Sequence, residues 1–291
     1  MAEHDKSQNE GQEGEAQKAA DAKELHRAVR EAGEAELDRP AGALFWSGLA
    51  AGIAIHSSLI AEGALHAGLP DAPWRNLVAA LGYPVGFLVV ILGRIQLFTE
   101  STITAMLPLV TKPSGWALRR TLRLWGIVLL ANLIGTALAA GMVAGGALGN
   151  AEIRESMLAV SERILALGGW ETFVNAIPAG FLIAVVAWIL PNGRTQAFWI
   201  ILAITYVIAI AGFSHSIVGA DETFLLLFTG KVDAARAFFG LLIPAILGNL
   251  VGGAGLFTLL AHGQVQGEAR GYAAGSGTRR PTGPAETGRD R

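Results

Sequence analysis

Six long stretches without Asp, Glu, Lys or Arg are the feature that most constrains this sequence of 291 residues. Each stretch reaches or approaches the roughly 20 apolar residues that a helix needs to cross a bilayer. The pattern predicts an all-α integral membrane protein with six transmembrane helices. The stretches are Pro40–Ala61, Asn76–Gly93, Leu124–Ala151, Thr172–Gly193, Thr195–Ala220 and Ala237–Ala261.

Charged residues are concentrated at the two ends of the chain. Residues 1–40 carry 11 acids and 6 bases, whereas the 222 residues from 41 to 262 carry only 10 acids and 11 bases. A soluble domain has about 25% charged residues, so residues 41–262 are predicted to be a transmembrane transporter domain. Residues 1–40 are an expected cytoplasmic tail, with disorder over residues 1–20 and a helix along the membrane surface over residues 22–37. Residues 263–291 are an expected flexible cytoplasmic tail.

Composition also excludes several classes of function. The absence of cysteine excludes a disulfide scaffold, a thiolate metal site and a cysteine nucleophile. The net charge of −2 gives no electrostatic case for binding nucleic acid. We therefore expect no metal, no cofactor and no catalytic residue, and we expect membrane lipid and a small solute as the partners.

Two shorter uncharged pieces, Ser101–Thr111 and Thr223–Gly230, follow the second and fifth long stretches. A polar cluster precedes each piece, which predicts that the second and fifth helices are broken. The chain then reads twice as long helix, broken helix, long helix. Because each half crosses the membrane three times, the second half is predicted to be inverted relative to the first. Inverted repeats with interrupted helices point to a transport site near the midplane.

The third helix of each half carries a local similarity. Asn132-Leu133-Ile134-Gly135 resembles Asn249-Leu250-Val251-Gly252, and Phe98 precedes Asn132 at nearly the spacing at which Phe213 precedes Asn249. Asn132 and Asn249 are buried amides suited to satisfy the backbone of the two breaks. Chance similarity between Gly-rich apolar helices is the alternative explanation.

Basic residues in the short connections predict the orientation. The connection after the second crossing holds Lys112, Arg119, Arg120 and Arg123 and no acid, whereas the third connection is rich in glutamate. Both termini are therefore expected to be cytoplasmic, in an inner (plasma) membrane.

His215 is the leading candidate for chemistry, because it sits inside the second break between Ser214 and Ser216. A histidine changes charge near neutral pH, so it can attract an anion or pass a proton to it. The alternative is a neutral histidine that only hydrogen-bonds the broken backbone. His56 in the first helix is interpreted mainly as a packing residue.

Arg94, Glu100 and Thr99 surround the first break. Charges at this depth usually face a bundle interior or a cavity, so Arg94 and Glu100 are expected either to pair structurally or to contribute Arg94 to an anion path. Thr99 is expected either to donate a hydrogen bond to a passing anion or to cap the following half-helix.

Three segments resemble the formate/nitrite transporter family: Gly93–Thr102 (GRIQLFTEST), Gly212–Ile217 (GFSHSI) and Gly248–Gly253 (GNLVGG). The resemblance covers about residues 41–262 in the same order and spacing. It implies an aquaporin-like protomer of six helices, a homopentamer, and one pore through each protomer. Formate, nitrite, acetate, lactate and hydrosulfide are the range of substrates in this family.

The resemblance also implies roles for individual residues. His215 corresponds to the family's central pore histidine, and Asn249 to an asparagine near it. Leu97, Phe98 and Thr99 correspond to the loop that gates the pore, with Thr99 able to hydrogen-bond the histidine. Two apolar constrictions are expected, one near Tyr83, Phe87 and Phe98 and the other near Ile208.

The sequence departs from the family in three places. Tyr83 and Ile208 stand where phenylalanine is usual. Many members have a lysine near the start of the fourth helix, thought to attract the anion, where this chain has Ser161-Glu162-Arg163-Ile164. Arg94 also differs from the formate channels, so the chain resembles a divergent branch whose substrate is not established.

The leading hypothesis is a channel or transporter for small monovalent anions or their conjugate weak acids. A pore for a neutral small solute is the first alternative. An intramembrane enzyme using Ser214 or Ser216 is weaker, because the sequence lacks a serine-nucleophile motif. A membrane protein that transports nothing is the remaining alternative.

Overall fold

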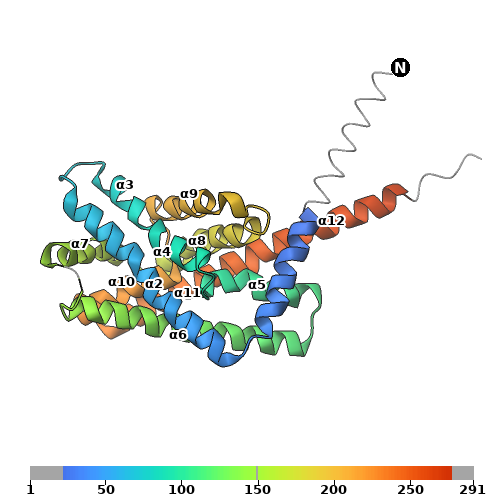
Figure 1. Cartoon of the computed structure of the whole chain (residues 1–291), viewed down its shortest axis with the longest axis horizontal. Helices are drawn as coiled ribbons and strands as arrows, with labels where there is room; N and C mark the ends of the chain where they lie inside the picture. Colours follow the sequence, from blue (N-terminus) through green and yellow to red (C-terminus); the bar gives the residue numbers. More distant parts are fainter. Residues whose placement is uncertain (1–21, 149, 277–291) are drawn as a thin grey trace, which may run out of the picture.

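The structure is a computed structural model that describes residues 22–148 and 150–276, and within them the chain is helical with no strand (Figure 1). The expected disorder of residues 1–20 lies outside the described residues. A helix over residues 22–37 comes first. It is followed in order by α2 Ala41–Gly68, α3 Arg75–Ala79, η1 Ala80–Gly82, α4 Pro84–Leu92, α5 Phe98–Thr111, α6 Gly115–Ala144, α7 Ala151–Ser161, η2 Glu162–Ala166, α8 Gly169–Ile189, η3 Arg194–Gln196, α9 Ala197–Ile210, α10 Ser216–Phe228, η4 Arg236–Leu242, α11 Ile243–Leu250, η5 Val251–Phe257 and α12 Thr258–Ser276.

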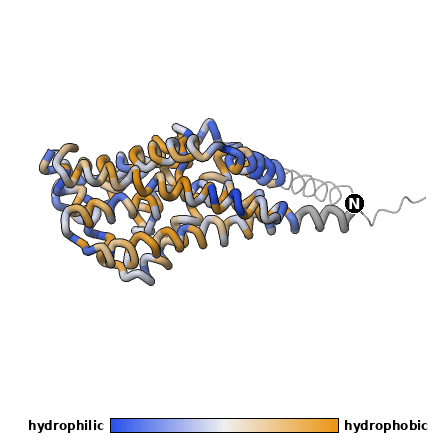
Figure 2. The backbone as a smooth tube through the Cα atoms, turned by 90° about the horizontal axis from the view of Figure 1, so that it is seen from below, coloured by the Kyte–Doolittle hydropathy of each residue, from blue (hydrophilic) through white to orange (hydrophobic). Residues whose placement is uncertain are grey.

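Five helical segments are long and apolar enough to cross a membrane: Ala41–Gly68, Arg75–Leu92, Gly115–Ala144, Gly169–Ile189 and Arg236–Gly267. The remaining expected crossing is a shorter apolar helix, Arg194–Ile210. Hydrophobic residues run along the bundle, and hydrophilic ones gather at its ends (Figure 2). Large apolar side chains face outward, as a bilayer requires. The all-α, multi-pass membrane fold is confirmed.

Both expected helix breaks are present. The chain leaves α4 at Leu92 and begins α5 at Phe98, and it leaves α9 at Ile210 and begins α10 at Ser216. The first break contains Arg94 at φ 52°, a left-handed conformation that is strained for any residue but glycine. The second break places Gly212 at φ 66°, where glycine is free of that strain.

Asn132 of α6 holds the first break. Its Oδ1 accepts a hydrogen bond from the Phe98 backbone N–H at 2.8 Å, and its Nδ2 donates to the carbonyls of Gln96 at 2.9 Å and Gly48 at 2.7 Å. Backbone groups freed by a break find no water inside a membrane. One buried amide therefore satisfies a donor and an acceptor where the break meets α5 and ties them to α2.

Asn249 of α11 does the same for the second break. Its Oδ1 accepts from the Ser216 N–H at 2.8 Å, and its Nδ2 donates to the carbonyls of Ser214 at 3.0 Å and Ala176 at 2.7 Å. The predicted equivalence of Asn132 and Asn249, and their expected role at the two breaks, are confirmed. The inversion of one half relative to the other stays a prediction.

The register between the halves differs from the one suggested by sequence. Because Asn132 caps Phe98 where Asn249 caps Ser216, Phe98 corresponds to Ser216 and not to Phe213. The pairing by aromatic residues was wrong because capping depends on backbone position and not on side-chain type. In the corrected register, His215 is the counterpart of Leu97.

Small residues bring the long helices into contact in both halves. A Cβ added to Gly52 of α2 would lie 2.3 Å from the Asn132 carbonyl oxygen of α6. A Cβ on Gly252 of η5 would lie 2.0 Å from the Ile177 carbonyl oxygen of α8. Neither site admits a larger residue, so these glycines set the helix separation, as expected of small residues in membrane bundles.

Residues 22–37 form a helix that packs against α5, and its expected position along the membrane surface stays a prediction. The Glu36 carboxylate accepts hydrogen bonds from Thr104 Oγ1 at 2.9 Å and Gln96 Nε2 at 3.2 Å. His26 Nε2 lies 3.1 Å from Nδ1 of His262 in α12. The helix thus covers the end of the bundle where α5 and α12 meet.

Two other segments are also helical. The third connection is an ordered helix, α7, capped by Asn150, whose Oδ1 accepts from the Ile153 N–H at 2.8 Å. The last helix continues to Ser276, so residues 263–276, expected to be flexible, are helical.

Candidate functional site

Two cavities lie toward opposite ends of α8. Thr172, near the start of α8, lines cavity 1 of about 230 Å³. Ala187, near its end, lines cavity 2 of about 450 Å³. Fifteen helical residues rise by about 22 Å. The two cavities therefore approach the middle of the bundle from its two ends.

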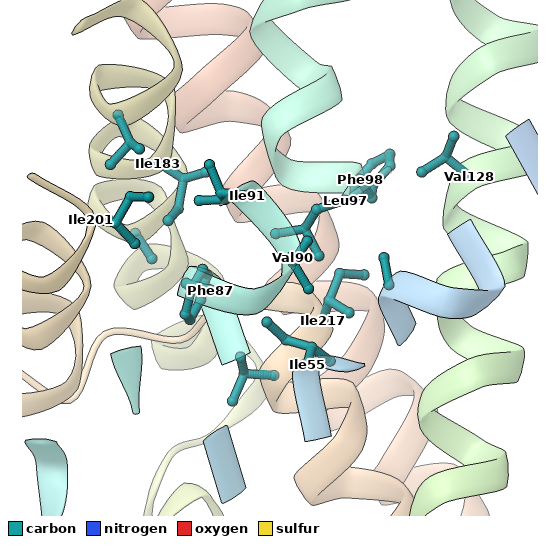
Figure 3. Packing of buried hydrophobic residues seen from close by; sticks show 14 of the residues in the cluster. Ile55, Phe87, Val90, Ile91, Leu97, Phe98, Val128, Ile183, Ile201 and Ile217 are labelled. Carbon is teal, nitrogen blue, oxygen red and sulfur yellow. The ribbon is translucent and has the colours of Figure 1, made fainter. Parts of the chain in front are cut away.

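An apolar cluster separates the cavities (Figure 3). Tyr83 lines cavity 1 and Ile91 lines cavity 2. Phe87 lies one helical turn from each and is fully buried. Leu97 and Ile183 belong to the same cluster and are also fully buried. A solute that passes from one cavity to the other has to cross this apolar partition.

His215 lies at the inner end of cavity 1, against the partition. It precedes α10 as the N-cap residue, and its Nδ1 accepts hydrogen bonds from the backbone N–H groups of Ile217 and Val218, each at 3.3 Å. The ring lines cavity 1 although only 2% of the residue's surface is exposed. Its ring and that of Phe87 pack edge to face, with ring centroids 4.9 Å apart.

The cap fixes the tautomer of His215. Because Nδ1 accepts from two backbone N–H groups, the proton of the neutral ring is on Nε2. Nε2 lies 2.9 Å from Thr99 Oγ1, the only side-chain bond it makes within the described residues. Thr99 is fully buried near the start of α5. The two broken helices therefore meet through one His–Thr hydrogen bond.

The residues expected at the two constrictions are packed together in one apolar cluster. Tyr83, Phe87, Leu97, Phe98 and Ile208 are all buried members of it. Tyr83 packs on Phe87 with ring centroids 5.3 Å apart. Their roles in a pore stay a prediction.

Arg94 and Glu100 both line cavity 2, and no ion pair joins them. The expected structural pairing of these two residues is therefore not formed, and the alternative, that Arg94 contributes to an anion path, stays a prediction. The strained backbone at Arg94 turns between α4 and α5 and leaves its side chain exposed. Arg194 lines the same cavity.

Sequence reasoning missed three charged residues that line cavity 1: Glu62, Arg163 and Glu222. Arg163 Nη2 donates to Glu62 Oε1 at 2.8 Å. A signal was available for Arg163, since it stands in the segment where the family lysine was sought. Glu62 and Glu222 follow apolar stretches and read as ordinary connection residues.

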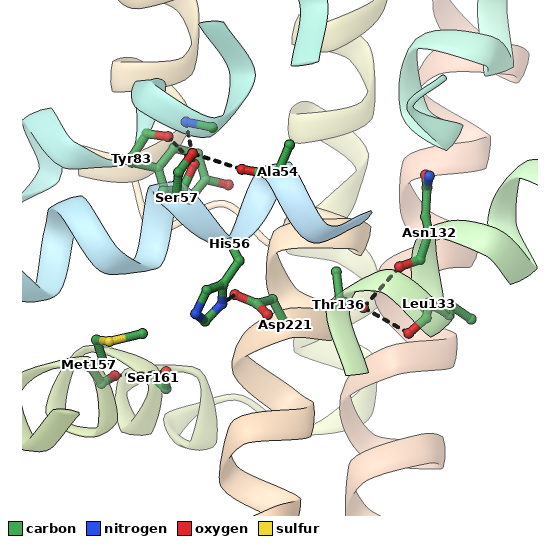
Figure 4. Close-up of polar contacts among 12 residues, drawn as sticks. Ala54, His56, Ser57, Tyr83, Asn132, Leu133, Thr136, Met157, Ser161 and Asp221 are labelled. Atoms are coloured by element: carbon green, nitrogen blue, oxygen red, sulfur yellow. Dashed lines mark hydrogen bonds and ion pairs between the residues drawn. The ribbon is translucent and has the colours of Figure 1, made fainter. Parts of the chain in front are cut away.

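His56 packs between helices, as interpreted, and it does so through a buried polar pair (Figure 4). Its Nδ1 lies 2.7 Å from Oδ2 of Asp221, with the two side chains 2% and 1% exposed. The pair ties α2 to α10. No group of three or more His, Asp or Glu side chains in the described part of the chain could hold a metal ion.

Broken helices that meet at a buried histidine between two opposed cavities define a helical membrane channel or transporter. The family profile for formate/nitrite transporters matches residues 23–263. The chain belongs to the formate/nitrite transporter family, whose members are channels and transporters and not enzymes.

Relatives and solved structures agree with this assignment. The chain is 36% identical over 244 residues to the inner membrane protein YfdC of Escherichia coli, covering 84% of this chain and 79% of that protein. It is 26% identical to the formate channel FocA of Haemophilus influenzae, covering 72% and 82%. It shares the fold of a pentameric formate channel with formate bound, at a TM-score of 0.68 and 22% identity, covering 78% and 97%.

Proposed function

We propose that this protein is a channel for small monovalent anions or their conjugate weak acids, with one pore per protomer of a homopentamer. Its relative FocA is a formate channel, and the pentameric channel that shares its fold binds formate, which supports the substrate class and the assembly. The relative YfdC is an inner membrane protein, which supports the same location for this chain. The basic connections support cytoplasmic termini.

One observation carries the proposal: His215, whose Nε2–H bonds Thr99, lines cavity 1 and packs against Phe87 of the apolar partition. A solute that reaches this point exchanges water for Phe87 and its apolar neighbours. Removing a bare anion from water costs several kcal/mol or more. A neutral acid avoids most of that cost, and the Nε2–H can then donate to its oxygen in place of Thr99.

The N-cap bonds limit what His215 does with protons. A neutral ring that passed its Nε2 proton to an anion would become an imidazolate, so the ring can act as an acid only after Nδ1 has also taken a proton. Nδ1 can do so only by releasing the Ile217 and Val218 N–H groups. This favours a neutral ring that guides the solute. In that case the proton joins the anion before the solute reaches the partition.

Uptake by proteoliposomes with an internal pH dye tests the proposal. Formate, nitrite, acetate and a sugar are compared at two external pH values. We expect protein-dependent and pH-sensitive uptake of the three weak acids and none of the sugar. We expect His215→Leu to change formate uptake by about tenfold, from the loss of one buried hydrogen bond at the pore, and to leave the oligomer intact.

His66→Leu is the matched control, because His66 lies in the last turn of α2 and lines neither cavity. Uptake by His215→Leu equal to wild type at both pH values would contradict a pore role for this histidine. No uptake of any anion by intact oligomers would favour the neutral-solute or non-transporting alternatives.

A further inference from the structure

Cavity 1 is lined by more carboxylates than arginines, which is unexpected for the entrance of an anion channel. Three charged side chains line it: Glu62, Arg163 and Glu222. Arg163 donates to Glu62 at 2.8 Å, so these two cancel. His215, which also lines the cavity, is held neutral by its cap. The carboxylate of Glu222 is left over.

Glu222 makes no hydrogen bond or ion pair within residues 22–148 and 150–267. Glu222 lines cavity 1 and is only partly buried. The neighbouring carboxylate differs, since Asp221 turns toward α2 and binds His56. Successive helical residues point about 100° apart. α10 thus presents Asp221 to the bundle and Glu222 to the cavity.

His215 and Glu222 share one face of α10. They are seven residues apart, which is close to two turns and about 10 Å of rise. Gly219 lies between them and also lines the cavity. A Cβ at Gly219 would meet no atom within 4 Å. At this position α10 therefore places no side chain between Glu222 and His215.

Cavity 2 differs in its charge balance. Arg94 and Arg194 line it together with Glu36 and Glu100. Its arginines and carboxylates are equal in number, whereas cavity 1 has one more carboxylate than arginine.

We propose that Glu222 is a specificity-determining residue whose carboxylate disfavours free anions in cavity 1, so that this cavity admits the small solute as the uncharged acid. This inference rests on the proposed function. A unit charge roughly 7 Å from an anion, at an effective dielectric constant of about 40 to 80, lowers the anion's occupancy by about three- to eightfold. The penalty falls on the anion and leaves an uncharged molecule of the same size unaffected.

The test compares uptake of formate and of formamide, an uncharged molecule of similar size, into proteoliposomes at about pH 7.5, where a carboxylic acid is almost wholly ionised. We expect E222Q to raise formate uptake by about three- to eightfold at low ionic strength and to leave formamide uptake unchanged. The gain shrinks in about 0.5 M salt, because the Debye length then falls to a few ångströms.

Two variants serve as controls. E222D keeps the charge, so it retains the wild-type ratio of formate to formamide uptake. E162Q makes the same change in net charge at a residue paired with Lys231 outside the cavity, so it also keeps that ratio. Circular dichroism and size-exclusion chromatography check that each variant folds and assembles.

A formate-to-formamide ratio that is the same in E222Q and wild type would overturn the inference while formate uptake itself upholds the proposed function. An equal gain in E162Q would also overturn it, since the effect would then come from net charge alone. If neither wild type nor any variant carries formate, both the inference and the proposed function fail.

Discussion

Asn249 offers the sharpest test of how the broken helices are held. Its side chain makes three hydrogen bonds, to the Ser216 N–H and to the carbonyls of Ser214 and Ala176, and the residue is fully buried. Asn249→Ala removes all three bonds at once. Because Ala176 lies inside α8, its carbonyl keeps a helical partner, so two backbone groups lose the bond that satisfies them.

The size of the effect follows from those two groups. A buried backbone group without a partner costs about 1–3 kcal/mol. We therefore expect Asn249→Ala to lower stability by about 2–6 kcal/mol. For a chain of this size that corresponds to a fall of about 5 °C or more in the thermal midpoint. Since Ser216 follows His215, formate uptake is expected to fall as well.

Thermal unfolding of the detergent-solubilised oligomer, followed by tryptophan fluorescence, measures the change. Asn175→Ala is the matched control, because Asn175 also donates to a carbonyl of the second break, that of Gly212, but at an exposed position. Water replaces that bond, so the midpoint is expected to stay within about 1–2 °C of wild type. Equal midpoints for Asn249→Ala and Asn175→Ala would refute the reasoning.

Three further predictions concern other parts of the site. Thr99→Val leaves the Nε2–H of His215 without its partner, so we expect about 1–3 kcal/mol of destabilisation and altered formate uptake; an unchanged thermal midpoint and unchanged uptake would contradict this. Arg94→Gly keeps the left-handed conformation at φ 52° and removes its steric cost, so a gain of about 1 kcal/mol in stability is expected; an unchanged thermal midpoint would argue against strain at this residue. Burial, then His262 and Arg30, lower the pKa of His26 below its usual 6.5, so the docked helix favours neutral His26. Docking is then complete above about pH 6.5 and is lost as the pH falls through the lowered value; fluorophores on helix 22–37 and α12 should separate on acidification, and a constant distance would count against the prediction.

Much of the fold was predictable because its signals are local. A span needs only a long uncharged stretch, and each of the six stretches carries that information in its own residues. The two breaks were visible for the same reason, since a polar cluster interrupts an apolar stretch. The repeated Asn132 and Asn249 were recognisable as a pair because each begins the same short motif.

The site was predictable where its residues lie in these motifs and not elsewhere. His215 and Thr99 were singled out from the two breaks, and the structure joins them over 116 residues of sequence. Glu62 and Arg163 are 101 residues apart, and His56 and Asp221 are 165 apart. A pattern read from neighbouring residues cannot pair side chains that are so far apart in the sequence.

The sequence by itself determined that the chain crosses a membrane, where its helices break, and which histidine sits in the second break. These properties follow from the free energy of placing each residue in hydrocarbon or water. Only the tertiary structure decided that Arg163 is neutralised by Glu62 and that Arg94 does not pair with Glu100. It also decided that Glu222 lines cavity 1 without a charged partner in the described part of the chain. The partner of a charge depends on which helix faces are brought together, and that choice is made by packing across the whole bundle.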